Sequence, residues 1–127
     1  MALSDNTILV VEDSVTQLVH LRALLEEEGL EVVIATDGEM GLQMARGLRP
    51  GLVILDLQMP RMNGFQVVQE LKKAKETAAI PVIMFSTHHE LETQTLGMQL
   101  GALEYIPKDA FADAVLLETL RQMGFIT

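Results

Sequence analysis

A single carboxylate at the end of a short apolar run is the feature that most constrains this chain. The run is LVIL (residues 52–55), Asp56 follows it, and Pro50 and Pro60 bound the stretch. An apolar run this short, enclosed by turn residues, indicates a strand buried on both faces, as in a parallel sheet. Ligands of open α/β sheets bind outside the carboxyl ends of the strands, so Asp56 is expected to lie at a functional site.

Apolar runs and helical patterns alternate along the whole chain. Strands are expected at residues 7–11, 31–35, 52–55, 81–85 and 102–106, and helices at residues 14–28, 39–46, 65–74, 90–100 and 110–123. This alternation predicts βαβ units with right-handed crossovers and a parallel sheet covered on both faces. The expected fold class is therefore α/β, in one domain that spans residues 1–127.

Four residues define or interrupt the expected helices. Ser14, with Gln17 three residues later, fits a capping box, and Asp109 is expected to cap the last helix. Gly97 falls inside the fourth helix, where glycine costs about 1 kcal/mol relative to alanine. We therefore expect that helix to be less rigid than the others.

Composition excludes several classes of protein. The chain contains no cysteine, so thiolate metal sites and cysteine nucleophiles are ruled out. A net charge of −9 argues against direct binding to nucleic acid, because that affinity depends on neutralising phosphates. No apolar run reaches the roughly 18 residues of a membrane span, and the N-terminus lacks the features of a signal peptide. A cytoplasmic protein that does not bind membranes is expected.

Polar groups gather where the expected strands end. Glu12 and Asp13 follow the first strand, Asp56 the third, Ser86 the fourth and Lys108 the fifth. All five are expected on one rim of the sheet. Three carboxylates placed together repel each other unless a cation is bound, and Mg²⁺ accepts such ligands while leaving room for phosphate oxygens.

Each of these residues, taken alone, also has a purely structural interpretation. Asp56 and Asp13 fit helix caps or turn residues, and Glu12 and Lys108 fit solvated surface charges. Ser86 fits a side chain that bonds to its own loop backbone. It is their concentration on one rim that favours a functional site.

Four motifs and their spacing carry a family resemblance. They are VVED at residues 10–13, DLQMP with NG at 56–64, ST at 86–87 and YIPK at 105–108. The chain resembles, over essentially its whole length, the receiver domain of two-component response regulators. That resemblance implies a flavodoxin-like (βα)5 fold with strand order 2-1-3-4-5.

The resemblance also implies a role for each group in phosphoryl transfer. Asp56 would be the phosphoacceptor, taking the phosphoryl group from a phosphohistidine. Mg²⁺, or Mn²⁺, would be bound by Asp13, Asp56 and the backbone carbonyl of Gln58 directly, and by Glu12 through water. Lys108 would neutralise phosphoryl oxygens.

A switch is implied as well. Ser86 would donate a hydrogen bond to the phosphoryl group once it is present, and the ring of Tyr105 would turn inward into the vacated space. The surface formed by the fourth helix, the fifth strand and the fifth helix would change as a result. From the sequence alone, Tyr105 is equally consistent with a half-buried aromatic residue at a strand end.

Three places depart from the family pattern. Asp109 follows Lys108 where the family usually has a proline after a cis bond, and a cis bond before a non-proline residue costs about 3 to 4 kcal/mol. Thr87 stands where a smaller residue is common and could narrow access to the phosphoryl group. Gln58 and His88 occupy positions that tune phosphoryl lifetime, so an altered lifetime is expected.

The implied partners are a sensor histidine kinase or phosphotransfer protein, and a downstream protein or linked output domain. A phosphorylation-dependent homodimer is also possible, and no enzymatic activity is expected beyond the chain's own phosphotransfer and dephosphorylation.

Two other classes of protein compete with this interpretation. An aspartate-nucleophile hydrolase would need an acid at the position of Gln58, and a flavodoxin-like cofactor module would need hydroxyls in place of Glu12 and Asp13. A phosphorylation-independent pseudo-receiver stays open because of Asp109.

Overall fold

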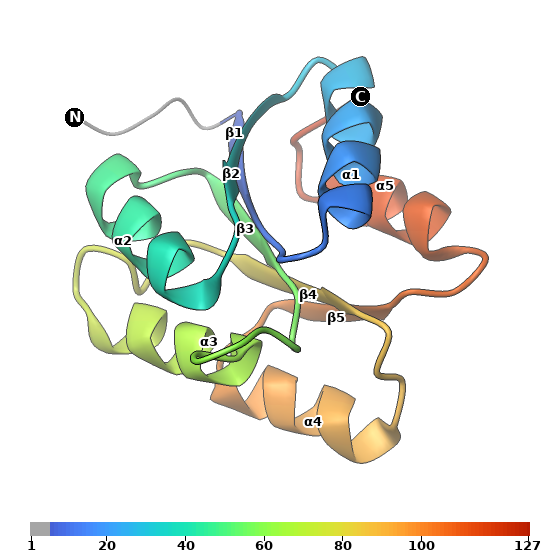
Figure 1. The fold of residues 1–127 in the computed structure, drawn as a ribbon. Coiled ribbons are helices and arrows are strands. Elements are labelled where there is room, and N and C mark those ends of the chain that lie inside the picture. Colours follow the sequence, from blue (N-terminus) through green and yellow to red (C-terminus); the bar gives the residue numbers. More distant parts are fainter. Residues whose placement is uncertain (1–5) are drawn as a thin grey trace.

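The chain forms one central parallel sheet with helices on both faces (Figure 1). The computed structural model describes residues 6–127, so the expectation about an N-terminal signal peptide lies partly outside the described residues. The strands lie in the order β2-β1-β3-β4-β5, which confirms the expected α/β fold and strand order. Among residues 6–127, no helix has the length and apolar character needed to cross a bilayer.

Five strands alternate with five helices within the described residues. The strands are β1 (Thr7–Val11), β2 (Glu31–Ala35), β3 (Leu52–Leu55), β4 (Val82–Ser86) and β5 (Glu104–Pro107). The helices are α1 (Val15–Glu27), α2 (Gly38–Leu48), α3 (Gly64–Lys73), α4 (Leu91–Leu100) and α5 (Ala112–Gln122). Helices α1 and α5 cover one face of the sheet, and α2, α3 and α4 cover the other.

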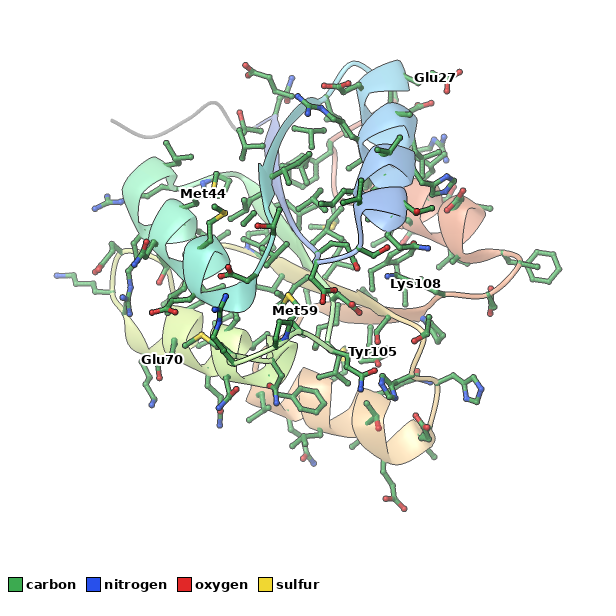
Figure 2. All side chains as sticks on the ribbon, in the orientation of Figure 1. Glu27, Met44, Met59, Glu70, Tyr105 and Lys108 are labelled. Carbon is green, nitrogen blue, oxygen red and sulfur yellow. The ribbon has the colours of Figure 1, made fainter. Side chains whose placement is uncertain are left out.

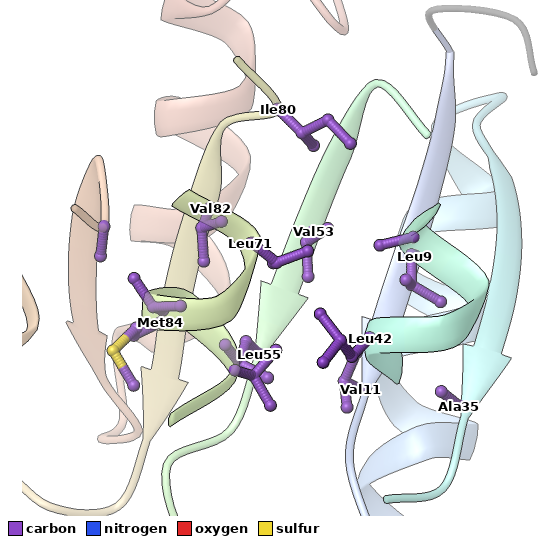
Figure 3. Packing of buried hydrophobic residues seen from close by; sticks show 14 of the residues in the cluster. Leu9, Val11, Ala35, Leu42, Val53, Leu55, Leu71, Ile80, Val82 and Met84 are labelled. Carbon is purple, nitrogen blue, oxygen red and sulfur yellow. The ribbon is translucent and has the colours of Figure 1, made fainter. Parts of the chain in front are cut away.

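Alternating strand residues divide the core into two clusters. In β3, Val53 and Leu55 join the cluster beneath α2 and α3 (Figure 3), whereas Leu52 and Ile54 join the cluster beneath α1 and α5. Successive side chains of a strand point to opposite faces, so a strand covered on both sides must be apolar at every position. All four residues of β3 are buried, as the sequence predicted.

The strand register brings the carboxyl ends of the inner strands to one rim. Val11 of β1 pairs with Leu55 of β3, and Leu55 pairs with Met84 of β4. Ser86, the last residue of β4, pairs with Pro107 of β5. The residues that follow these positions therefore emerge side by side.

Some predicted helix boundaries are wrong. Helix α5 begins at Ala112 and not at Ala110, because the Asp109 carboxylate accepts a hydrogen bond from the backbone N–H of Phe111 (2.8 Å) in a preceding turn. The residue at the N-cap of α5 is Phe111, which makes no side-chain cap. Helix α2 extends from Gly38 to Leu48, beyond the predicted residues 39–46.

The predicted capping box at Ser14 is half formed. Its hydroxyl accepts the N–H of Gln17 (3.4 Å), but its own N–H donates to the Glu12 carboxylate (3.1 Å) and not to the side chain of Gln17. A complete capping box stands instead at the start of α3, between Asn63 and Gln66. The start of α1 is thereby coupled to a carboxylate of the rim.

Gly64 is required by the close approach of α3 to the chain that follows β3. A Cβ atom added there would lie 2.4 Å from the backbone oxygen of Asp56 and 2.9 Å from Cα of Leu57. We expect Gly64→Ala to lower the free energy of unfolding by about 2 kcal/mol, since overpacking against backbone forces a shift. Urea denaturation followed by circular dichroism measures the effect.

Gly47 provides the matched control, because a Cβ atom there has no neighbour within 4 Å. Gly47→Ala should be neutral or stabilise the domain by up to about 1 kcal/mol through helix propensity. Equal unfolding midpoints for the two variants would contradict the packing argument at Gly64.

Candidate functional site

Three carboxylates from two strand ends meet on the rim. One oxygen each from Glu12, Asp13 and Asp56 lies within 4.8 Å of the other two. Glu12 is buried, Asp13 is exposed, and the side chain of Asp56 is 11% exposed. The predicted acidic cluster is therefore present, with Asp56 at the surface of the core and reachable from solvent.

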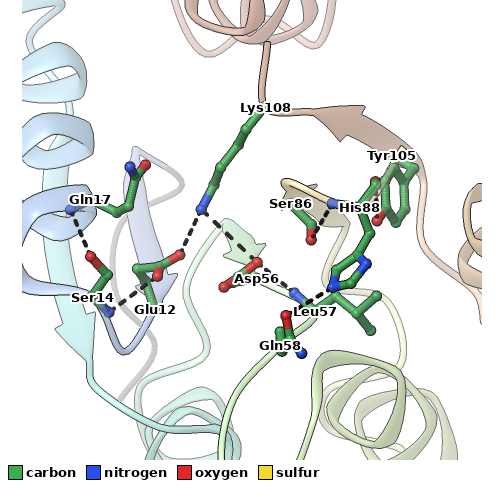
Figure 4. Close-up of polar contacts among 10 residues, drawn as sticks. All are labelled: Glu12, Ser14, Gln17, Asp56, Leu57, Gln58, Ser86, His88, Tyr105 and Lys108. Carbon is green, nitrogen blue, oxygen red and sulfur yellow. Dashed lines mark hydrogen bonds and ion pairs between the residues drawn. The ribbon is translucent and has the colours of Figure 1, made fainter. Parts of the chain in front are cut away.

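Lys108 extends from the end of β5 into this acidic cluster (Figure 4). Its Nζ lies 3.0 Å from Oε2 of Glu12 and 4.0 Å from Oδ1 of Asp56. The backbone N–H of Lys108 donates to the carbonyl of Ser86 (2.7 Å), which fixes the backbone of Lys108 beside β4. One ammonium thus faces three carboxylates, and the site keeps an excess of negative charge.

The pKa of Glu12 is shifted by its burial and by these neighbouring charges. Burial raises the pKa of Glu12 above its ordinary value of 4.5; the hydrogen bond from Lys108 lowers this pKa, and the charge of Asp56 raises it further. A buried carboxylate with a raised pKa is stabilised when a cation is added beside it. Three hard oxygen donors close together fit Mg²⁺, which prefers carboxylates and water.

The backbone of Asp56 and of its neighbours fixes the orientation of the carboxylate. Its Oδ1 accepts the N–H of Leu57 (2.8 Å), and its own N–H donates to the carbonyl of Val11 (3.0 Å). The bond to Val11 continues the hydrogen-bonding pattern of β1 and β3 by one residue. The side chain is therefore preoriented by the sheet itself.

Ser86 and Tyr105 both contact the backbone of His88. The N–H of His88 donates to the hydroxyl of Ser86 (3.3 Å), and the hydroxyl of Tyr105 donates to the carbonyl of His88 (2.8 Å). Both residues are buried, and Tyr105, labelled in Figure 2, is 7% exposed. The ring of Tyr105 thus lies inward in this structure, rather than half-buried at the strand end.

Burial also raises the pKa of the Tyr105 phenol above 10. The nearby Ser86 hydroxyl opposes this shift, whereas the negative charges of Asp56 and Glu90 increase it. The neutral phenol is the form that donates to the His88 carbonyl. The raised pKa therefore keeps the phenol in this donating form at neutral pH.

The side chains of Gln58 and His88 meet beside the acidic cluster. Nε2 of His88 lies 2.9 Å from Oε1 of Gln58, a contact between the loops that follow β3 and β4 (Figure 4). These residues line a pocket of about 340 Å³ together with Leu57, Met59, Asn63 and Phe65. The family resemblance identified both positions. It did not predict their contact, because the two residues are 30 positions apart and local sequence patterns do not report contacts at that separation.

Thr87 and Lys108 line a second opening, between α1 and the start of α5. It measures about 470 Å³, and its lining also includes His20 and Asp113, whose side chains lie 2.7 Å apart. The exposed Thr87 lines the same opening as Lys108. The described residues contain no cis peptide bond, so Asp109 follows Lys108 in a trans arrangement.

The rim therefore joins an acidic cluster that includes a partly exposed aspartate, an ammonium and a buried hydroxyl. The family model of the response regulator receiver domain matches residues 8–121. This chain belongs to that family, whose members are the signalling modules of two-component systems and interact with histidine kinases or phosphotransfer proteins and with output partners.

Curated relatives and solved structures agree with this assignment. Protein PilH of Pseudomonas aeruginosa is 38% identical over 109 residues, which cover 86% of this chain and 90% of that protein. The chemotaxis protein CheY4 of Vibrio cholerae has a TM-score of 0.83 at 30% identity, covering 96% of this chain and 98% of that one.

A third relative is considerably longer than this chain. The alkaline phosphatase synthesis transcriptional regulatory protein PhoP of Bacillus subtilis is 35% identical over 101 residues. The match covers 80% of this chain but 41% of PhoP. The chain thus spans less than half the length of that transcriptional regulator.

Magnesium binding should stabilise the domain in a pH-dependent way. The pKa of Glu12 is raised on folding, so the stability contributed by its protonated form is present below pH 4.5 and is lost as pH rises through the folded pKa. A cation among the carboxylates offsets that loss. At about 100 times its Kd, bound Mg²⁺ should add about 2.7 kcal/mol.

Thermal unfolding with and without Mg²⁺ measures this effect. The rise in Tm should be larger near neutral pH than near pH 4.5, and Asp13→Asn should reduce it. Removal of the exposed carboxylate Glu118, far from the rim on α5, should leave the rise unchanged. An equal rise at both pH values would contradict binding at the acidic cluster.

Proposed function

We propose that this chain is a phosphoacceptor switch in a histidine-to-aspartate phosphorelay, with Asp56 as the acceptor. The observation that carries the proposal is the position of Asp56, at the carboxyl end of β3 and in contact with Lys108. Its side chain is 11% exposed, and its Oδ1 is oriented by the N–H of Leu57. An oriented, accessible carboxylate beside a cation is suited to nucleophilic attack on phosphorus.

The transfer forms one bond and breaks one. A carboxylate oxygen of Asp56 attacks the phosphorus of a phosphohistidine, the P–N bond breaks, and its electron pair stays with the imidazole of the donor. Lys108, 4.0 Å from Oδ1 of Asp56, is placed to neutralise the phosphoryl oxygens. Most of the catalysis in such transfers comes from positioning and charge stabilisation.

The metal expected from the sequence is part of the proposal. Asp13, Asp56 and the backbone carbonyl of Gln58 would bind Mg²⁺ directly, and Glu12 would do so through water. Mn²⁺ has the same preference for oxygen ligands. When bound, the ion supplies positive charge for the phosphoryl oxygens. Proximity of the three carboxylates supports this set.

Phosphorylation would act on the rest of the molecule through Ser86. Its hydroxyl accepts the N–H of His88 in this structure, and on phosphorylation its O–H would turn to donate to a phosphoryl oxygen. That movement would shift the peptide of His88, to which the hydroxyl of Tyr105 is bonded. The surface of α4, β5 and α5 would then change. A full population shift would need the phosphoryl group to interact more favourably with the switched state by about 5 kcal/mol.

The proposed partners are those expected from the sequence. A sensor histidine kinase or phosphotransfer protein would supply the phosphoryl group, in the cytoplasm, and a downstream protein or linked output domain would read the switched surface. Alternatively, the switched surface would form a homodimer interface on phosphorylation. The net charge of −9 favours protein partners over direct contact with nucleic acid. Beyond its own phosphotransfer and dephosphorylation, no catalysis is proposed.

Intact mass after incubation with acetyl phosphate and Mg²⁺ tests the acceptor. Attack by Asp56 breaks the P–O bond and releases acetate, so the wild-type chain should gain one phosphoryl group. Asp56→Asn should gain none, and omission of Mg²⁺ should slow the gain strongly. Glu118→Gln, which removes an exposed carboxylate of α5, should behave as wild type. A gain of equal size in Asp56→Asn would overturn the assignment.

The contact between Gln58 and His88 should lengthen the life of the phosphoryl group. Their side chains bond at 2.9 Å, and in this position they would limit the approach of water to a phosphoryl group on Asp56. Loss of one such bond is worth about 1 kcal/mol, so Gln58→Ala and His88→Ala should each shorten the half-life about five-fold. Decay of the phosphorylated mass after removal of acetyl phosphate measures it.

A double-mutant cycle separates the bond from the two individual side chains. If the bond limits hydrolysis, the double variant should decay about as fast as either single variant. Additive effects would show that the two residues act independently. Thr87→Ala, run beside them, tests whether Thr87 narrows access from the opposite side and should likewise shorten the half-life.

A further inference from the structure

Helix α4 is attached to the sheet in an unusual way. Gly97 is the residue it buries, whereas Leu91 is 78%, Leu96 41% and Met98 43% exposed. Its N-cap residue, Glu90, makes no side-chain cap. Most helices bury their large apolar side chains and expose small or polar ones. In α4, the fully buried position is a residue without a side chain, and Leu100 near the end of the helix packs against the core while only partly buried.

The space above Gly97 is filled by the side chains beneath the helix. A Cβ atom added there would lie 3.0 Å from Sδ of Met84, 3.2 Å from Cδ2 of Tyr105 and 3.6 Å from Cε1 of Phe65. Carbon atoms in favourable contact lie about 3.5 to 4.0 Å apart. Even one methyl group at position 97 would therefore press on the ring of Tyr105.

That ring is connected to the rim by hydrogen bonds. Its hydroxyl donates to the carbonyl of His88 (2.8 Å), and the N–H of His88 donates to Ser86 (3.3 Å). The ring can lie inward because α4 approaches closely without a side chain between them. A group that displaces the ring would break its bond to His88 and free the loop that carries Ser86.

We propose that Gly97 is a positioning residue of the switch: its missing side chain leaves the space in which the ring of Tyr105 lies inward, and a side chain there turns the ring outward. This inference rests on the proposed function for the roles of Ser86 and Tyr105. It also gives a reason for a glycine within a helix, where alanine would favour helix formation. The glycine sets how readily the ring changes position.

Tyr105 reports its own position, because the chain contains one tyrosine and no tryptophan. Quenching of its fluorescence by acrylamide, a neutral quencher, measures how accessible the ring is in the unphosphorylated protein. The wild-type ring, 7% exposed, should be quenched weakly. Gly97→Ala should raise the quenching constant several-fold and Gly97→Val should raise it further.

Gly47→Ala is the matched control, since it also replaces a helical glycine but meets no atom within 4 Å. It should leave quenching at the wild-type value. If Gly97→Ala also leaves quenching at the wild-type value, and raises Tm by as much as Gly47→Ala does, the proposal is overturned. Gly97→Ala decides the question even if Gly97→Val does not fold, because its added methyl already contacts the ring.

The rate of phosphorylation by acetyl phosphate provides the second measurement. Gly97→Ala should change this rate several-fold, whereas Gly47→Ala should not. If the wild-type protein is phosphorylated but quenching is unaltered in both Gly97 variants, this inference is overturned and the proposed function stands. Raised quenching in the variants, with no phosphorylation of the wild-type protein, would support the packing role of Gly97 and overturn the proposed function.

Discussion

Repulsion among three carboxylates, opposed by one ammonium, is the constraint on which the site depends. Glu12 is buried and its pKa is raised, so the fold accepts an unfavourable charge at the end of β1. Lys108 compensates part of this cost through a bond of 3.0 Å to Glu12. A cation or a phosphoryl group changes the balance of charge, and this sensitivity suits the rim to a role in phosphorylation-dependent signalling.

The sheet makes this arrangement possible because it leaves little freedom to the groups on its rim. The backbone of Asp56 continues the ladder between β1 and β3, and the backbone of Lys108 is bonded to the last residue of β4. Core clusters on both faces fix the strands that carry them. Charged groups that repel one another are thereby kept together by packing energy supplied elsewhere in the domain.

The other side of the rim carries the residues of the proposed switch. The peptide of His88 is bonded both to Ser86 and to Tyr105, so a change at either residue reaches the other. Helix α4 covers this region with a glycine against the core and with leucine and methionine side chains toward solvent. In the proposed switch, this helix above a buried ring is the element that a small local change would displace.

The sequence by itself determined the fold and the members of the acidic cluster. Fully apolar strands such as residues 52–55 have one environment that suits them, the interior of a parallel sheet, and the end of each strand then locates Asp56, Ser86 and Lys108. Local signals were less reliable at helix starts: Asp109 looked like a cap, but its carboxylate closes the turn before α5.

Only the tertiary structure decided that Gln58 meets His88, that the ring of Tyr105 lies inward, and that Gly97 makes room for it. Those contacts join residues far apart in the chain, and their geometry depends on how closely a helix approaches the sheet, which periodicity and propensity do not encode.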